Sequence, residues 1–587
     1  MVNQELAGIF YELAFYLEME NIPFKPQAYR KAALFLESLN QDAEDIYRRE
    51  GKEGLEKIPG VGKGMAQKII EYLKTGKISE YEKFKKKIPV NLKELTSIEG
   101  IGPKAVRDLY KYLKIKNLAQ LEQAALKGKI RKLPNFGEKS EKNILEAINF
   151  IKKSQGRFFL DEAWRLADKI VFQLESLKEV EKVSVAGSLR RMKETIGDID
   201  LLATIKKKVL VSEALAKEGN KKIMDVFTRL DGVIKIWDYG FKKSFVRFYE
   251  GIDVDLRVVT SNESGSALQY FTGSKEHNII TRKLALEKGL KLNEYGVFKG
   301  KKRVAGKTEE EIYKIIGLPY IEPELRENTG EIEAGLKNQL PKIIGYNEIK
   351  GDLHCHSDWD GGEDSMEEMA KAAQEMGYEY IGISDHTKFL KIEHGLDENQ
   401  LLEQHKAIER LNRKMQDARY KIRVLHGCEA NILEDGRLDI DEKILAKLDY
   451  VIAGIHSQMK MSKEKMNERL IRAMKNPLVK IISHPTGRLI QRRDEYQIDF
   501  EKVLNAALET RTALEVNSYP QRLDLKDSNI RKAVEKGVKI CVNTDAHQKD
   551  QMKFIKFGIA QARRGWAGKD DIINSWPIKK LLEFFKN

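Results

Sequence analysis

Two aspartates, Asp198 and Asp200, stand two positions apart in an apolar stretch and have types and spacing suited to chemistry. Residues 197–201 read Gly-Asp-Ile-Asp-Leu, which predicts a β-strand. Because side chains two apart in a strand share a face, both carboxylates project together while Ile199 and Leu201 point into the core. Such a pair can hold two Mg²⁺ ions about 4 Å apart, which activates a hydroxyl and steadies a leaving pyrophosphate.

Two nearby segments fit the same phosphoryl-transfer chemistry. A predicted strand over residues 252–259 carries Asp253 and Asp255 and so offers a third carboxylate. Upstream, a Gly187-Ser188 turn precedes Arg191. For Asp198 and Asp200 alone, a strand edge with two solvated carboxylates is the alternative, and the two added segments argue against it.

Histidines gather in the second part of the chain, where nine of the ten follow residue 350. Seven apolar runs there each precede a helical pattern, and most end in His, Asp or Glu, which predicts a (β/α) barrel with these residues at one end. Imidazole together with carboxylate suits Zn, Mn or Fe, up to three ions that generate hydroxide and hold a phosphate. Arg488 is a candidate contact for that phosphate. A purely structural role for the metals is the alternative.

Glycine turns recur in the first part of the chain at spacings of roughly forty residues. The first carries Gly60, Gly62 and Lys63, and the second carries Gly100, Gly102 and Lys104. Glycine admits positive φ and lets backbone N–H groups approach a ligand, and the helix that follows adds a partial positive charge. These turns predict sequence-independent contacts with phosphate. A third segment, residues 133–139, has Asn135 in place of the first glycine and is either another such turn or a plain helix connection.

Charge divides the chain in the same way. Residues 1–350 carry 64 Lys+Arg against 51 Asp+Glu, whereas residues 351–587 carry 40 against 39. Residues 51–150 alone hold 22 basic and 12 acidic side chains, which indicates a surface that faces a nucleic-acid backbone, with a generic solvated helical surface as the alternative.

The overall composition predicts a multi-domain cytoplasmic protein. At 587 residues the chain is too long for one core. No signal peptide and no membrane-spanning run is visible, so no membrane partner is expected. Three scattered cysteines argue against a disulfide framework.

The glycine turns resemble the helix-hairpin-helix motif, and the aspartate region resembles the X-family DNA polymerases, relatives of DNA polymerase beta. The second resemblance rests on Gly-Ser-Leu-Arg-Arg at 187–191, Gly-Asp-Ile-Asp at 197–200, Asp-Leu-Arg at 255–257 and Tyr-Phe-Thr-Gly-Ser at 270–274. It implies catalytic roles for Asp198, Asp200 and Asp255. It also implies nucleotide-binding roles for Gly187, Ser188, Arg191, Tyr270, Phe271, Gly273 and Asn278, and a template contact for Arg282.

Residues 29–33 and the helix after Gly62 resemble the lyase domain of that family. Lys68 falls at its Schiff-base position, where an amine with a lowered pKa could attack an abasic sugar aldehyde. A solvated lysine that aids DNA binding is the alternative.

The histidine region resembles the PHP (polymerase and histidinol phosphatase) domain along nearly its whole length. The ligands that this resemblance implies are His354, His356, His386, Glu429, His456, His484, Asp545 and His547. The position five residues after the second histidine, which often supplies another ligand, is Gly361 here, and Asp360 is the candidate substitute.

Together these resemblances imply a multi-domain α+β and α/β chain. The expected parts are a lyase-like helix-hairpin-helix domain (1–85), a second one (86–150), a palm with a mixed sheet (151–260), a nucleotide-selecting thumb (261–320), a linker (321–348) and a distorted (β/α)7 PHP barrel (349–587). The implied activity is gap-filling repair synthesis on gapped or primer-template DNA with dNTPs, using Mg²⁺ or Mn²⁺. The PHP part, with two or three Mn²⁺ or Zn²⁺ ions, is expected to act as a 3′-5′ exonuclease or phosphodiesterase and on abasic sites. A monomer is expected. A DNA-binding platform attached to a working PHP enzyme is the competing hypothesis.

Overall fold

The computed structural model describes residues 2–38, 41–58, 60–96, 98, 101–154, 156–206 and 213–586. The chain splits into two compact units, Met1–Gln155 with Gln491–Arg493, and Gly156–Ile490 with Asp494–Asn587. None of the described helices is long and apolar enough to cross a membrane.

Helices build the described part of residues 1–155, and they pack around one hydrophobic core. Leu6, Phe10 and Leu13 of the first helix lie in this core together with Ile69 and Leu109, which shows that both predicted turn segments share it. The helices are α1 (Val2–Met19), α2 (Lys25–Ser38), α3 (Ala43–Glu56), α4 (Lys63–Thr75), α5 (Ser79–Lys87), α6 (Leu92–Thr96), α7 (Pro103–Leu113), α8 (Leu118–Leu126), the 3-10 turn η1 (Ile130–Lys132) and α9 (Glu138–Ser154).

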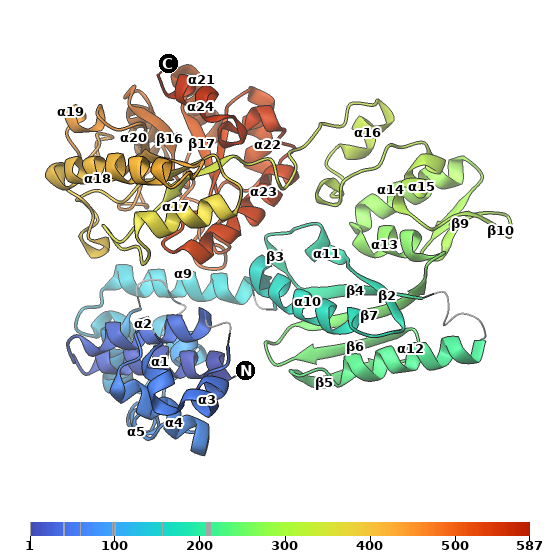
Figure 1. Ribbon diagram of the computed structural model, residues 1–587, viewed down its shortest axis with the longest axis horizontal. Helices are drawn as coiled ribbons and strands as arrows, with labels where there is room; N and C mark the ends of the chain where they lie inside the picture. The colour runs from blue at the N-terminus through green and yellow to red at the C-terminus, as the bar shows by residue number, and fades with distance from the viewer. Residues whose placement is uncertain are drawn as a thin grey trace. The chain divides into compact units, whose positions relative to one another are not determined.

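The second unit begins with a five-stranded mixed sheet in the order β2-β4-β7-β6-β5, in which only β4 and β7 are parallel. Helices α10 and α12 pack on it and on each other, so one face is covered (Figure 1). The alternation of β4 places Ile199 and Leu201 in this covered core, as predicted. The elements are β1 (Phe158–Phe159), α10 (Leu160–Glu175), β2 (Val180–Val185), α11 (Gly187–Arg190), β3 (Thr195–Ile196), β4 (Asp198–Ile205), α12 (Glu213–Thr228), β5 (Val233–Tyr239), β6 (Lys243–Phe248) and β7 (Asp253–Thr260).

A smaller helical layer with a three-stranded antiparallel sheet follows, and it has its own core. Its elements are α13 (Ser264–Thr272), α14 (Lys275–Glu287), β8 (Lys291–Asn293), β9 (Gly296–Lys299), β10 (Lys302–Ala305), α15 (Glu309–Ile316), η3 (Pro323–Leu325) and α16 (Glu331–Leu336). Within residues 321–348, Arg326 is fully buried and Glu324 pairs with Arg563 at 2.8 Å, so this stretch packs against its surroundings.

Seven parallel strand positions with helices between them form the C-terminal part, which confirms the predicted (β/α)7 arrangement (Figure 1). Strands β13 and β14 are consecutive parts of one predicted strand, so eight strands fill seven positions. They belong to two sheets, which are joined by bridges between His386 and Glu429 and between Cys355 and Ala546. The strands are β11 (Gly351–Cys355), β12 (Tyr380–Ile383), β13 (Arg423–His426), β14 (Glu429–Asn431), β15 (Val451–Gly454), β16 (Val479–Ile482), β17 (Ala513–Asn517) and β18 (Ile540–Asn543). The helices are α17 (Met366–Glu375), α18 (Glu398–Asp417), α19 (Glu442–Leu445), α20 (Lys463–Met474), α21 (Phe500–Thr510), α22 (Asp527–Lys536), α23 (Ile555–Arg564) and α24 (Ile578–Lys586), and the 3-10 turn η5 (Lys549–Phe554) precedes α23.

A buried ion network ties the palm to the layer that follows it. Glu309 lies 2.6 Å from Arg190 and 2.5 Å from Arg326, whose side chain is wholly buried. Burial alone would raise the pKa of Glu309, but Arg326 and Arg190 lower it to about 2. A buried charge that is paired in this way becomes costly when its partner is removed.

We expect Glu309→Gln to destabilise the protein by about 3 kcal/mol at neutral pH, because it leaves the buried guanidinium of Arg326 and the partly buried one of Arg190 without their carboxylate. The folded pKa of Glu309 is depressed, so its contribution is present above the ordinary carboxyl pKa and is lost as the pH falls toward about 2. Urea unfolding from pH 7 downward should therefore show the gap between wild type and variant narrowing below about pH 4.5. The exposed neighbour Glu310→Gln is the control, and a gap that is independent of pH would contradict this account.

Two candidate metal-dependent active sites

Three carboxylates meet on the open face of the palm sheet. Strands β4 and β7 are in register with Asp198 beside Asp253 and Asp200 beside Asp255. Asp253 accepts hydrogen bonds from Arg247 at 2.7 and 2.8 Å, so its oxygens are already occupied. The Oδ1 atom of Asp255 is buried without a hydrogen-bond partner. The other oxygen of Asp255 lies 3.3 Å from Lys243 and 3.6 Å from Arg257, so Oδ1 is the atom left to act together with Asp198 and Asp200.

The electrostatics of this trio favour a bound cation. Burial, then the charges of Asp198 and Asp255, raises the pKa of Asp200 to about 7. Burial and the neighbouring carboxylates of Asp255 and Asp253 also raise the pKa of Asp198. Crowded carboxylates disfavour their own ionisation unless a positive charge lies between them. Together with the unpartnered Asp255 oxygen, this all-oxygen donor set fits Mg²⁺ or Mn²⁺.

The turn after β2 lies directly against this trio. Gly187 has φ +60°, and a Cβ there would fall 2.1 Å from an oxygen of Asp200, so only glycine allows the close approach. Ser188 follows in α11. Arg191 donates from Nε to Glu327 at 3.0 Å and from Nη1 to the carbonyl of Thr272 at 2.5 Å. The turn therefore presents backbone and a guanidinium beside the carboxylates.

The end of α13 and the start of α14 form one connected group. Asn278 donates to the carbonyl of Tyr270 at 2.6 Å, and Arg282 lies 5.4 Å from the Tyr270 ring. The rings of Tyr270 and Phe271 meet edge to face at 5.0 Å. Gly273, with φ +70°, caps α13, and a Cβ there would fall 3.2 Å from Nη1 of Arg191. Sequence-predicted nucleotide residues from separate elements are thus brought together.

A second cluster lies at the strand ends of the barrel and is centred on Glu429. Its two carboxylate oxygens lie 3.0 to 3.4 Å from four imidazole nitrogens, those of His354, His386, His456 and His484. Asp545 lies 3.2 Å from His356.

The donor atoms of this second cluster form four groups of possible ligands, which are His356-His386-His547, His354-His356-Asp545, His386-Glu429-His456 and His356-Asp360-Asp385. The Nε2 atoms of His354 and His356 are buried without hydrogen-bond partners, as expected of nitrogens that point toward metal. The donor set fits a cluster of Mn²⁺ or Zn²⁺ ions.

Carboxylates hold the other nitrogens of these rings. Glu515 accepts from His354 Nδ1 at 2.7 Å, and Asp360 lies 2.8 Å from Nδ1 of both His356 and His386. Such contacts orient metal-binding imidazoles and raise their basicity. The sequence reasoning missed Glu515, although a carboxylate inside an apolar strand run was a usable signal.

Position 361, where a further ligand was expected, is next to Glu393. A Cβ at Gly361 would lie 2.5 Å from Glu393 Oε2, so the Glu393 carboxylate occupies the space where a side chain at position 361 would begin.

Arg488, the candidate phosphate contact, pairs with the palm in this structure. Its Nη2 atom lies 2.8 Å from Glu194 of the palm, and it also donates to the carbonyl of Leu523. The side chain is 9% exposed. Nη2 of Arg488 is therefore engaged with Glu194 and Leu523.

The glycine turns of the first unit share one backbone geometry. Gly60 has φ +77° and Asn135 has φ +67°, and in both turns the next residue donates to the carbonyl three positions back. The third segment is therefore the same kind of turn, with asparagine in the left-handed conformation. Gly100 lies outside the described residues, but Ile101 donates to Ile98 in the same pattern at 3.0 Å.

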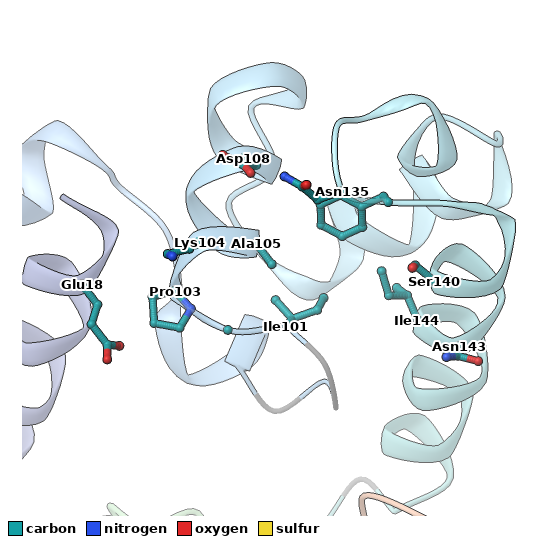
Figure 2. Close-up of a pocket in the computed structure, with 12 residues that line it drawn as sticks. Glu18, Ile101, Pro103, Lys104, Ala105, Asp108, Asn135, Ser140, Asn143 and Ile144 are labelled. Carbon is teal, nitrogen blue, oxygen red and sulfur yellow. The ribbon is translucent and has the colours of Figure 1, made fainter. Parts of the chain in front are cut away.

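The N-termini of the helices that follow these turns, α4 and α7, are exposed to solvent. Gly62 and Gly102 cap α4 and α7, and nothing lies within 4 Å of the place where either Cβ would be. Lys63 and Lys104 follow, and both are exposed. Figure 2 shows Lys104 and Asn135 lining a pocket of about 760 Å³ between the second and third turns. Free helix N-termini next to lysine suit phosphate.

Lys68 on α4 is not in the state that amine attack needs. Its Nζ lies 3.0 Å from Glu80 and 5.8 Å from the ring of Tyr29. Burial lowers its pKa, but hydrogen bonds to Tyr29 and Glu80 outweigh this and raise the pKa above its ordinary value. The expected lowered pKa is absent here.

Four family models match the chain. They are a helix-hairpin-helix domain (residues 1–78), a SAM-like helix-hairpin-helix tandem (92–149), the DNA polymerase beta thumb (267–327) and the PHP domain (352–519). The tandem model covers the third turn as well as the second.

Whole-chain and partial relatives agree with these matches. The DNA polymerase/3'-5' exonuclease PolX of Bacillus subtilis is 36% identical over 589 residues, covering 100% of both chains. A probable phosphatase of Caldicellulosiruptor bescii is 35% identical over 210 residues, 34% of this chain and 81% of that one. A crystal structure of Leishmania infantum polymerase beta, a ternary complex, covers 40% of this chain and 97% of that chain at 24% identity with a TM-score of 0.27.

A carboxylate trio on a mixed sheet, a thumb, hairpin helices and a histidine barrel define a nucleotidyltransferase joined to a metal-dependent phosphoesterase. The chain belongs to the X-family DNA polymerases that carry a C-terminal PHP domain.

Proposed function

We propose that the protein is a DNA-directed DNA polymerase that fills gaps during DNA repair, and that its PHP domain removes nucleotides from DNA 3′ ends. The convergence of Asp198, Asp200 and Asp255 beside the Gly187 turn carries the first part. The Glu429-centred cluster carries the second. We further propose the sequence-based domain boundaries, action as a monomer and a cytoplasmic location.

In the polymerase site, Asp198 and Asp200 would hold Mg²⁺ or Mn²⁺ from one face of β4. Bound ions supply charge neutralisation of the triphosphate and activation of the primer 3′-hydroxyl. The Ser188 turn and Arg191 would hold the triphosphate, and Asp255 Oδ1, which lacks a partner, would face the hydroxyl. Tyr270 and Phe271 would pack on the deoxyribose.

In the PHP site, the eight ligands and the orienting carboxylates Asp360 and Glu515 would hold two or three Mn²⁺ or Zn²⁺ ions. Such ions supply hydroxide and hold a phosphodiester. The Bacillus subtilis relative is named as a 3'-5' exonuclease, which supports this assignment. Cleavage at abasic sites is a further proposed reaction of this domain.

A product assay on gapped DNA tests both parts. Wild type, Asp198→Ala and His354→Ala would be compared with and without dNTPs, in Mg²⁺ and in Mn²⁺. We expect wild type to fill the gap when dNTPs are present and to shorten the primer when they are absent. Asp198→Ala should lose gap filling, and His354→Ala should lose primer shortening. Equal gap filling by Asp198→Ala and wild type would contradict the polymerase assignment and favour the hypothesis that this half of the chain only binds DNA. Full nuclease activity in His354→Ala would leave the PHP metals structural.

We also propose that Lys68 is the nucleophile of a lyase reaction on abasic sugars, and that Glu80 restrains it. Glu80→Gln should lower the pKa of Lys68, since it removes a hydrogen-bonded negative charge. Each unit of lowering raises the free-amine fraction about tenfold. Borohydride trapping on DNA with a 5′ abasic sugar should therefore increase in Glu80→Gln and vanish in Lys68→Arg. Unchanged trapping in both variants would assign Lys68 to DNA binding alone.

A further inference from the structure

The PHP domain contacts the palm at Arg191, just after the Gly187 turn. Arg564, the last residue of α23, donates from Nη1 to the backbone carbonyl of Arg191 at 2.8 Å. The same guanidinium pairs with Asp527 at the start of α22 at 2.6 Å. Its side chain is 4% exposed, so these contacts are shielded from solvent. A side chain of the second domain thereby fixes the main chain of a residue in the first.

The side chain of Arg191 is held through the same residue. Glu327 Oε1 accepts from Arg191 Nε at 3.0 Å and from Arg564 Nη1 at 3.0 Å. One carboxylate oxygen is thus shared by two guanidinium groups, with Lys193 3.7 Å away, and Arg564 neutralises part of the charge that acts on Arg191. Both the backbone and the side chain of Arg191 therefore depend on Arg564.

A second contact holds Glu194, three residues after Arg191. Arg488 and Gln561 donate to Glu194 at 2.8 and 3.4 Å. Beneath these polar contacts, Phe557 and Leu523 of the PHP domain share a hydrophobic core with Met192 of the turn. Residues 191–194, which follow the Gly187 turn, are therefore held at both ends of this segment, and a well-packed interface of this kind keeps its residues in fixed positions.

The clamping residues are close in sequence to the histidine cluster. Arg488 comes four residues after His484, and α23 begins eight residues after His547 with η5 between them. The chain thus runs directly from two metal-ligand candidates, His484 and His547, to the residues that contact the palm.

We infer that Arg564 is a positioning residue for nucleotide binding in the palm, so that the PHP domain is part of the polymerase machinery as well as an active domain of its own. This inference rests on the proposed polymerase function. Precise placement of triphosphate-binding groups contributes strongly to nucleotidyl transfer, and a displacement of about 1 Å can cost about 10²-fold. Lysine at position 564 would keep the charge, but a single ammonium cannot reproduce the forked contact with three oxygens.

We therefore expect Arg564→Lys to raise the KM for dNTPs about tenfold while kcat falls less, and to leave 3′-5′ exonuclease activity unchanged. Glu327→Gln should raise the same KM, and the double variant should lose less than the two single losses combined because the residues share one network. Arg437→Lys, at an exposed PHP arginine that pairs with Asp435, is the matched control and should behave as wild type.

Two results would overturn the inference if wild type extends primers, and a third measurement decides if it does not. The first is a dNTP KM in Arg564→Lys equal to that of wild type. The second is a parallel loss of both activities, which would reduce Arg564 to general support of the fold. If wild type does not extend primers at all, the proposed function fails on its own. Equilibrium binding of dATP then still decides, because equal affinity in wild type and Arg564→Lys would overturn the positioning role, and weaker binding in the variant would uphold it.

Discussion

Asp200→Asn is expected to reduce gap filling by about 10³-fold while the exonuclease activity stays at the wild-type level. Asp200 lies closest to the Gly187 turn, and burial with two carboxylate neighbours raises its pKa to about 7. An amide of the same shape removes the negative charge that a bound cation would stabilise. Since the variant keeps the volume of the side chain, the loss should appear in catalysis and metal binding rather than in folding.

Asp253→Asn is the matched control for this prediction. Asp253 stands on the adjacent strand beside Asp198, but Arg247 and Trp237 already occupy its oxygens at 2.7 to 2.9 Å. We expect it to retain gap filling within about threefold of wild type, as a side chain outside the proposed catalytic trio would. Single-turnover extension of a one-nucleotide gap measures both variants. Equal losses in the two would show that the sheet face, and not the trio, was disturbed.

The sequence was informative wherever one local rule decides the geometry. Period-two alternation placed Asp198 and Asp200 on one face without knowledge of the fold. The choice between Asp253 and Asp255 rested on a family resemblance. Its physical reason is the pairing of Arg247 with Asp253, which depends on the register of β6 against β7. Register between strands distant in sequence is not readable from either strand alone.

Long-range contacts account for what the sequence reasoning missed. Glu515 orients His354 across 161 positions, and Arg488 meets Glu194 across 294. A charged residue near a ligand motif looks like a substrate contact until the surface against which it packs is known. Asn135 shows the converse case, because its backbone takes the left-handed conformation that the first glycine of such a turn would use.

Glu429→Gln is expected to remove metal from the PHP site and to reduce exonuclease activity by about 10²-fold or more, the scale seen for groups that support bound metal. Four imidazole nitrogens surround its oxygens within 3.4 Å, and the side chain is 1% exposed. Ser483 already donates to Oε1 at 2.6 Å. A neutral amide would turn one acceptor into a donor facing imidazoles and would remove the negative charge that a bound cation needs.

Metal content by elemental analysis separates this prediction from a loss of activity alone. Wild type should retain two or three ions per chain after gel filtration, and Glu429→Gln should retain fewer, whereas the exposed carboxylate variant Asp435→Asn should match wild type. Gap filling by Glu429→Gln tests the link between the domains. If the clamp on the Gly187 turn depends on the fold of the barrel and not on its metals, gap filling persists at the wild-type dNTP KM. A raised KM in this variant would mean that metal occupancy at Glu429 is transmitted along α23 to Arg564.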